Sequence, residues 1–152
     1  MRALFVLGRA IFGGFFIWNG VNLILERQRM SQYAAVKGVS TPEVAVPGSG
    51  ALLLAGGLSV MAGFKPRQGL AAIIGFLIPV SLQMHRFWDV QDPQQRQMEL
   101  VQFSKNMALL GAALMMLQLS EPWPVSVDDV LPDRDEEMFV HLGGRNLRAL
   151  PA

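Results

Sequence analysis

The side chains in this sequence that could do chemistry lie close to its apolar runs. His85, Trp88 and Asp89 follow one run, and Lys105 and Asn106 lie within the next. An imidazole, an ammonium group and an amide can each donate a hydrogen bond to a carbonyl oxygen, and an indole ring can lie against a planar ligand. These residue types suit the binding of a neutral ring that carries carbonyl groups, such as a quinone.

Further polar residues have helical spacing in the first apolar run. Asn19, Asn22 and Glu26 occur at i, i+3 and i+7, which places them along one face of a helix. Polar groups at membrane depth are costly, so we expect them to face one another or a polar cavity. The predicted ligand-binding site therefore contains nine residues: His85, Trp88, Asp89, Phe103, Lys105, Asn106, Asn19, Asn22 and Glu26.

Other kinds of site have less support in the sequence. The chain has no cysteine, which excludes disulfides, iron–sulfur clusters and thiolate zinc sites. Haem ligation by two histidines would need a second buried histidine, but His141 is near the C-terminus. A metal site would have to combine His85 with Asp89 or Glu26, a spacing expected by chance. No nucleophile–base pair is evident, so we predict no metal and no catalysis by this chain alone. A bound quinone is the cofactor to consider, and the catalytic residues are unknown.

Several of these residues also have a structural interpretation. Trp88 can anchor the chain at the headgroup region, where indole rings are common. Lys105 can extend its ammonium group to the membrane surface, and Asn106 can hydrogen-bond to a neighbouring helix. Arg9, in the first run, can pair with acidic residues near the C-terminus, reach the surface or stabilise the bundle. Both interpretations stay open for each residue.

The composition indicates a membrane protein. Of the 152 residues, 51% are hydrophobic and 16% charged, and the mean hydropathy is +0.32, which is too apolar for an ordinary soluble protein. The 13 basic residues barely exceed the 12 acidic ones, so no basic surface is available for nucleic acid. We expect membrane lipid to be the main surrounding of this chain.

Four apolar runs are long enough, or nearly so, to cross a bilayer core of about 30 Å as helices. A soluble bundle would need a polar face on every helix, whereas here the charges lie at the ends of the runs. We predict an all-α fold, a four-helix transmembrane bundle with a short amphipathic segment after the first helix and a soluble tail. The predicted spans are residues 3–25, 47–64, 69–87 and 98–119, the amphipathic segment falls within 26–46, and the domains are 1–119 and a polar, loosely ordered tail, 120–152.

Small residues recur every four positions in the second predicted span. Ala51, Ala55, Ser59 and Gly63 would form one ridge, against which a neighbouring helix could pack closely. We predict that this ridge serves packing and carries no chemistry.

Three stretches of the sequence resemble the DoxX family of small bacterial membrane proteins. They are "LGRAIFGGFFIWNGVNLI" in the first run, the glycine-rich "GGLSVMAGFKPRQGLAA", and "MHRFWD" together with "QFSKNMALLGAAL". The resemblance covers residues 3–119 and implies a four-helix bundle in the bacterial cytoplasmic (inner) membrane, with both termini in the cytoplasm. The chain departs from the pattern at Asn22, where many relatives have lysine, and in the second span, which lacks their acidic residue. The basic residues are divided too evenly between the two ends to indicate the orientation.

The same resemblance suggests a function. Some members of the family are subunits or partners of quinone-linked oxidoreductases, so the leading hypothesis is an auxiliary subunit of such a redox complex. The alternative is a non-enzymatic membrane scaffold or chaperone-like protein, in which the polar residues only hold helices together. A small-molecule carrier, which four short helices could form only as a homo-oligomer, is the third hypothesis.

Overall fold

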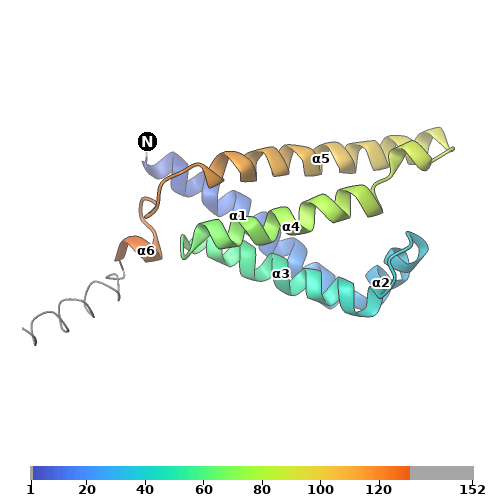
Figure 1. Ribbon diagram of the computed structural model, residues 1–152, viewed down its shortest axis with the longest axis horizontal. Coiled ribbons are helices and arrows are strands. Elements are labelled where there is room, and N and C mark those ends of the chain that lie inside the picture. The colour runs from blue at the N-terminus through green and yellow to red at the C-terminus, as the bar shows by residue number, and fades with distance from the viewer. Residues whose placement is uncertain (1, 131–152) are drawn as a thin grey trace, which may run out of the picture.

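The structure, a computed structural model, describes residues 2–130, and every regular element in that range is a helix (Figure 1). This confirms the all-α prediction. The long helices run side by side, and the short α2 lies across one end of them. In chain order the elements are α1 (Arg2–Leu25), α2 (Arg27–Val36), α3 (Pro42–Ala62), α4 (Pro66–Met84), the 3₁₀ helix η1 (Phe87–Asp89), α5 (Pro93–Leu117) and α6 (Val127–Val130).

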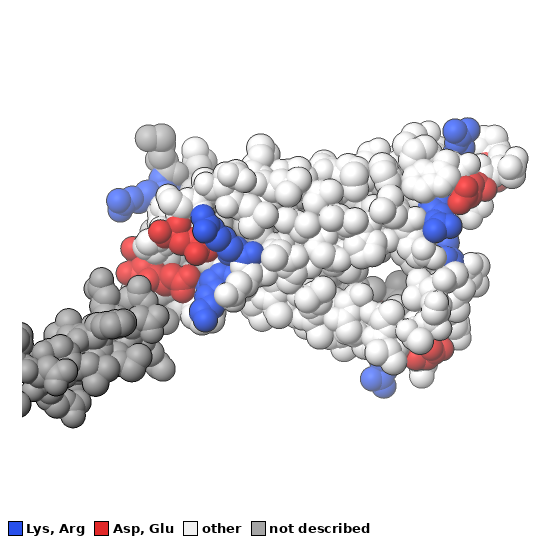
Figure 2. Space-filling model, in the orientation of Figure 1, with Lys and Arg blue, Asp and Glu red and all other residues white. Residues whose placement is uncertain are grey.

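Four segments of the described chain are long and apolar enough to cross a membrane, as predicted. They are Arg2–Leu25, Pro42–Ala62, Pro66–Asp89 and Pro93–Leu117. Lysine, arginine and carboxylate side chains gather at the two ends of the molecule, and the face in view between them is uncharged (Figure 2). This distribution matches a slab of hydrocarbon with polar layers on either side. The apolar outer surface therefore contacts membrane lipid.

Two of these helices begin five residues earlier than the sequence suggested. α3 begins at Pro42 after the N-cap Thr41, and Pro47 lies inside the helix. α5 begins at Pro93, after Asp92 accepts a hydrogen bond from the backbone N–H of Gln95 at 2.7 Å. Proline fits the first turn of a helix because the N–H that it lacks would have no partner there. The polar loops next to the spans thus contribute an extra turn to each helix.

Glycines make the tightest helix contact, which joins α1 to α3. A Cβ atom added at Gly13 would lie 2.7 Å from the carbonyl oxygen of Gly57, and one added at Gly57 would lie 2.7 Å from the carbonyl of Gly13. Gly20 and Gly50 have the same reciprocal relation, with distances of 2.7 and 2.9 Å. Packing between helices in lipid depends on such close backbone approach, because lipid is as apolar as the side chains. The α1–α3 pair is therefore specified by glycine.

The predicted ridge of small residues in α3 packs at one end only. Ser59 packs against Gly69 of α4, and Gly63 is buried. Ala51 and Ala55 are exposed, and the buried face consists of positions one or two residues away, including Gly50 and Gly57. The spacing of four residues was a valid packing signal, but several faces of this glycine- and alanine-rich helix display it. The choice among them depends on the partner helix.

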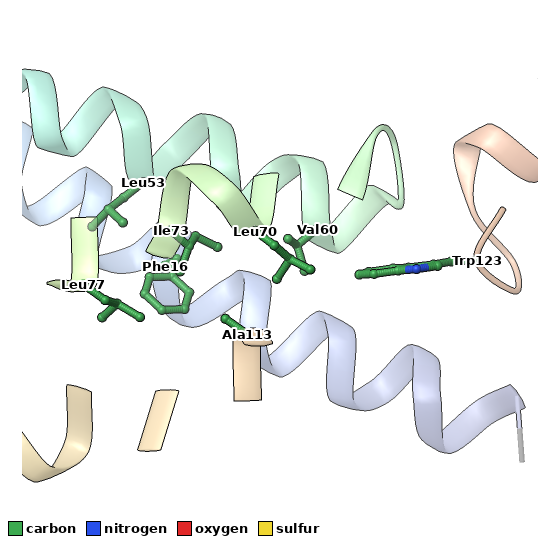
Figure 3. Close-up of a cluster of buried hydrophobic side chains, with 8 residues drawn as sticks. All are labelled: Phe16, Leu53, Val60, Leu70, Ile73, Leu77, Ala113 and Trp123. Atoms are coloured by element: carbon green, nitrogen blue, oxygen red, sulfur yellow. The ribbon is translucent and has the colours of Figure 1, made fainter. Parts of the chain in front are cut away.

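A compact apolar core lies where α1, α3, α4 and α5 meet (Figure 3). α3 is central, since α1 and α4 both pack against it, and α5 packs against α4. Trp123, which follows the last long helix, closes one end of this core and is 1% exposed. The fully buried side chains of the core are Phe16, Leu53, Val60, Leu70, Ile73, Leu77, Ala113 and Trp123.

Part of the predicted tail lies against the bundle. The Arg9 guanidinium donates from Nη2 to the carbonyl of Val125 at 2.7 Å, and the Lys65 backbone N–H donates to Asp128 Oδ2 at 2.8 Å. Arg9 is 4% exposed, so it fixes this segment to α1 and does not reach the surface. Among the roles considered for Arg9, the structural one fits these contacts. The rest of the tail lies outside the described residues, and the domain division at residue 119 stays a prediction.

The glycine contact leads to a stability prediction. We expect Gly57→Ala to lower the free energy of unfolding by about 1–3 kcal/mol, because the methyl group would overlap the Gly13 carbonyl and separate the helices. Gly14→Ala is the matched control, since a Cβ there would meet nothing within 4 Å. Unfolding in mild detergent would measure both variants. Equal stability of the two would contradict the role of this contact.

Candidate functional site

The Glu99 carboxylate is the centre of a polar cluster at one end of the bundle. Its Oε1 accepts hydrogen bonds from Lys37 Nζ at 2.5 Å and from the Tyr33 hydroxyl at 3.4 Å. Its Oε2 lies 2.8 Å from His85 Nδ1, which donates because an ionised carboxylate can only accept. Glu99 is 7% exposed, and burial of a carboxylate requires compensation of this kind. The cluster joins three helices through one side chain.

The helix ends place these groups. Lys37 is the C-cap of α2, and His85 is the C-cap of α4. Asp92 caps the start of α5, and Glu99 follows it by seven residues, which is two turns of helix. His85 precedes Asp92 by the same number of residues, so a helical hairpin around this cap brings Glu99 opposite His85.

The pKa shifts of Lys37 and Tyr33 favour an ionised Lys37–Glu99 pair. Burial is the largest single effect on Lys37 and would lower its pKa, but the hydrogen bonds and charge interactions with Glu99 and Tyr33 together outweigh burial and raise the pKa. Burial and the negative charge of Glu99 raise the pKa of Tyr33. Since the folded-state pKa of Lys37 lies above its unfolded value, its stabilising effect is complete below the ordinary lysine pKa and is lost as the pH rises through the raised one. The pair therefore holds across neutral pH.

A cavity of about 530 Å³ lies beside this cluster, between α3 and α4 and beneath the segment that follows α2. Gln83 joins the two features, because its side-chain amide lines the cavity and donates to the Lys37 carbonyl at 2.9 Å. The cavity is lined by Leu23, Ala34, Gly38, Val39, Ser40, Ala45, Val46, Ser49, Leu52, Gly75, Phe76, Pro79, Val80, Leu82, Gln83, Met84 and Arg86.

The cavity has one polar end. Along α4 it extends from Gly75 to Met84, about 14 Å of helical rise, and Arg86 lies just beyond the helix. Arg86 donates from Nη2 to Gln83 Oε1 at 3.1 Å, so these two side chains and Ser40 form a rim of hydrogen-bonding groups. Toward Gly75 the lining is apolar. This polarity matches an amphiphilic molecule that lies along the bundle.

The structure brings some of the predicted site residues together. The Trp88 and Phe103 ring centroids lie 5.9 Å apart, and the Phe87 ring completes a triangle with them, 5.0 Å from Trp88 and 5.4 Å from Phe103. These aromatic residues lie on η1 and α5, next to His85 in sequence or across the hairpin. Trp88 is 48% exposed, so the aromatic corner is open on one side.

The remaining predicted residues make separate local interactions. Asn19 donates to the Phe15 carbonyl at 2.7 Å within α1, and Glu26 pairs with Arg29 at 3.2 Å in an exposed position. The Asp89 carboxylate lies 3.9 Å from Arg86, and Lys105 donates to Gln102 at 2.5 Å. Asn106 is buried, and the backbone carbonyl of Asn22 accepts from the backbone N–H of Glu26 at 2.9 Å. None of the nine predicted residues lines the cavity described above. Their part in ligand binding stays a prediction.

Sequence reasoning missed four residues that organise this end of the bundle: Glu99, Lys37, Tyr33 and Gln83. A usable signal was present, because the helical hairpin at Asp92 pairs positions equally distant from the turn, and these include His85 and Glu99. Glu99 was assigned instead to the edge of a span. Among residues 2–130, no three metal-binding side chains of His, Cys, Asp or Glu come together. The His85–Glu99 pair is thus better suited to holding helices, or one end of a polar ligand, than to holding a metal ion.

Removal of Glu99 should release α2. We expect Glu99→Leu to destabilise the protein by about 3 kcal/mol, since Lys37 would lose its buried counter-charge and His85 its hydrogen-bond partner. Because the chain contains no cysteine, Ala34→Cys, at a position only 2% exposed, provides a probe of α2 by thiol labelling. Labelling should become about tenfold faster in the Glu99→Leu background, as tenfold corresponds to about 1.4 kcal/mol of easier opening.

The control for this experiment removes both charges. The double variant Lys37→Met, Glu99→Leu leaves neither partner buried alone, so it should be more stable than Glu99→Leu. If the single variant labelled no faster than the parent, the cluster would not be what holds α2 in place.

Comparison with known proteins places the chain in a family. The family model named DoxX matches residues 4–86, which is more than half of the chain and extends from α1 to the end of α4. No curated protein and no solved structure matches it. The match agrees with the four membrane-spanning helices, and α5, which carries Glu99, lies outside it. The chain therefore belongs to the DoxX family and is a multi-pass membrane protein.

Proposed function

We propose that this protein is an auxiliary subunit of a quinone-linked membrane oxidoreductase complex and holds a quinone-type lipid in the cavity between α3 and α4. The observation that carries the proposal is the cavity itself, with about 530 Å³ of space, a largely apolar lining and a polar rim. Sites for small molecules in proteins have volumes of about 300–1,000 Å³ and a few well-placed polar groups.

The length of the cavity matches a lipid that lies within one leaflet of the bilayer. The helical rise of about 14 Å along the cavity is close to half of a hydrocarbon core of about 30 Å. A quinone ring at the rim would accept hydrogen bonds from Gln83, Ser40 or Arg86 through its carbonyl oxygens. Its isoprenoid tail would lie toward Gly75, among aliphatic side chains. The ligand would thus enter from the membrane without crossing water.

The aromatic corner is the other place where a quinone ring could bind. There Trp88 and Phe103 offer ring faces, and the Nδ1 bond to Glu99 orients His85. This corner includes several of the residues first proposed from the sequence. The cavity supports ligand binding better, because residues of four helices line it and a concave site covers more of a ligand than an open corner does.

An auxiliary role follows from the chemistry that the side chains offer. Quinone reduction needs two electrons, and cysteine, a common carrier or cluster ligand, is absent from the sequence. The electrons would come from a partner oxidoreductase subunit, and this chain would bind and position the quinone. We further propose the bacterial cytoplasmic membrane as its location, with the termini in the cytoplasm.

A membrane scaffold is the competing function. The observation in its favour is that Glu99 is satisfied by Lys37, Tyr33 and His85 within the protein and needs no ligand. In that case ordinary lipid would fill the cavity, and the cavity would bind quinone no more tightly than it binds other lipids. The ligand experiment below separates the two functions.

A variant that fills the cavity tests the proposed function. Gly75 lines the cavity, and a Cβ there would meet nothing within 4 Å, so Gly75→Leu should occupy the space without disturbing the helices. We expect it to weaken the binding of a short-chain quinone by at least about tenfold, measured by displacement of a photoreactive quinone analogue in nanodiscs. Gly111→Leu, at an equally open position of α5 outside the cavity, should bind as the parent does. Equal binding by both variants would overturn the assignment of the cavity.

The proposed orientation has its own test. The segment after α2 and the α4–α5 connection lie at one end of the bundle, opposite the N-terminus and the α3–α4 turn. Reporter fusions at Gly38 and at Val90 should therefore both show the periplasmic signal, and a fusion at Lys65 the cytoplasmic one. A cytoplasmic signal at Gly38 and Val90 together would invert the proposed topology, and different signals at these two positions would contradict the bundle.

A further inference from the structure

Lys105 is a charged residue on the outer surface of a membrane-spanning helix. Its side chain is exposed, and its ammonium group donates to the neighbouring Gln102 at 2.5 Å. The nearest aromatic partner is the Phe15 ring of α1, with Nζ 5.9 Å from the ring centroid. In the part of the chain that the structure describes, no carboxylate lies within 4.0 Å of Lys105. Its charge is thus presented to the surroundings of the bundle.

Two other ionisable residues within the spans are buried and have hydrogen-bond partners in the protein. Glu99 is buried between Lys37 and His85, and Arg9 is buried beneath the segment that supplies the Val125 carbonyl. Ionisable side chains in membrane helices almost always face the interior of a bundle, a water-filled cavity or one another. Lys105 departs from this rule as long as the chain is alone. An additional helix beside α5 would restore the rule.

The depth of Lys105 argues against a simple interfacial position. It is the middle residue of α5, with twelve residues of the helix on either side. It also lies six residues beyond Glu99, about 9 Å deeper along the helix axis than the polar cluster that marks one end of the bundle. A lysine at this depth has to bend its whole stem to bring the ammonium group to the headgroups. Instead, the ammonium group here lies beside Gln102 and the Phe15 ring.

The surface around Lys105 has the composition of a helix-packing face. Met98, Val101, Gln102 and Ala108 are exposed on the same side of α5, at helical spacings of three, four and seven residues from Lys105. Ala108 would permit close approach of another backbone, and the amide of Gln102 adds hydrogen-bonding capacity. We call these five residues the α5 face. Within residues 2–130, the main packing partners of α5 are α4 and η1.

We propose that the α5 face docks a transmembrane helix of another protein, one that carries a buried aspartate or glutamate opposite Lys105. In hydrocarbon an ammonium–carboxylate pair is attractive over a longer range than in water, because the low dielectric constant strengthens the charge interaction. The side-chain amide of Gln102 donates a second hydrogen bond to the same carboxylate through Nε2. A suitable partner helix must therefore carry a carboxylate at the membrane depth of Lys105.

A second copy of this chain is a poor occupant. Copies inserted in the same orientation place each residue at the same membrane depth, so a two-fold contact through the α5 face would bring Lys105 opposite Lys105. Two like charges facing each other in a low-dielectric environment repel. The only carboxylate of α5, that of Glu99, is already engaged by Lys37 and His85. The charge pattern therefore favours a different chain.

A synthetic transmembrane peptide tests this surface directly. The probe is a leucine-rich helix with one central glutamate, labelled for fluorescence energy transfer to the full-length protein in liposomes of zwitterionic lipid. We expect the glutamate peptide to bind about tenfold more tightly than the same peptide with leucine or glutamine at the centre. Lys105→Met should abolish this preference, and Lys105→Arg should keep most of it. Lys65→Met, which removes an exposed lysine outside the spans, is the matched control and should keep all of it.

A charge exchange makes the test specific. Lys105→Glu should lose the glutamate peptide and gain preference for a peptide with a central lysine. Equal binding of all peptides to the parent would overturn the proposal, as would a preference for anionic lipid over the glutamate peptide, because Lys105 would then act at the headgroups. The inference adds a partner surface to the proposed auxiliary role. Since the assay contains no quinone, its outcome is independent of whether the cavity binds one.

Discussion

The arrangement of one end of this bundle depends on a single buried carboxylate. Glu99 binds Lys37 and Tyr33 at α2 and His85 at the end of α4, so α2, which packs little on α4 or α5, is connected to both helices at one point. The cost of burying this charge is offset only while all its partners are present. Such a group determines the relative position of the helices more than it adds to the free energy of folding, because all its contacts form in one arrangement only. The apolar contacts of α2 alone would allow several.

That geometry also determines the roof of the cavity. Lys37 is bound to Glu99 through its side chain and to Gln83 through its carbonyl oxygen, and the next three residues of the chain line the cavity. The polar cluster and the ligand space are therefore two sides of one short segment. The affinity for a ligand at the rim would therefore depend on the position of this segment. A ligand that displaces Gln83 or Arg86 would in turn change the contacts of the cluster. The cavity thus owes part of its shape to Glu99, a charged residue that does not line it.

The sequence was sufficient for those features that depend on composition and short-range pattern. Four apolar runs between charged ends predicted four spans, and the amphipathic stretch after the first run predicted α2. It was insufficient wherever the choice depended on a partner. Ala51 and Ala55 are small residues at a helical spacing, as are the glycines that make the contact, so only the position of α1 decides the face. Glu99, at the edge of a run, looked like a boundary charge, because Lys37 and His85 come from residues far away in sequence. Lys105 and Asn106 stood out in the sequence as polar residues within an apolar run, and their part in ligand binding stays a prediction.

The position of the cavity follows from the way α3 and α4 diverge. Near their connecting turn the two helices touch through glycine, since a Cβ at Gly56 would lie 2.9 Å from the Gly69 carbonyl, and Ser59 packs against Gly69. Toward the other end the lining includes Leu52 and Val46 on α3 and Phe76 on α4, whose larger side chains require more separation. The glycine seam with α1 fixes the opposite side of α3, so α3 cannot lean over to close the gap. Because glycine contacts hold α3 against α4 near their turn and against α1 along its length, a space remains between α3 and α4 at the other end. The segment after α2, which Glu99 anchors through Lys37, covers this space without filling it.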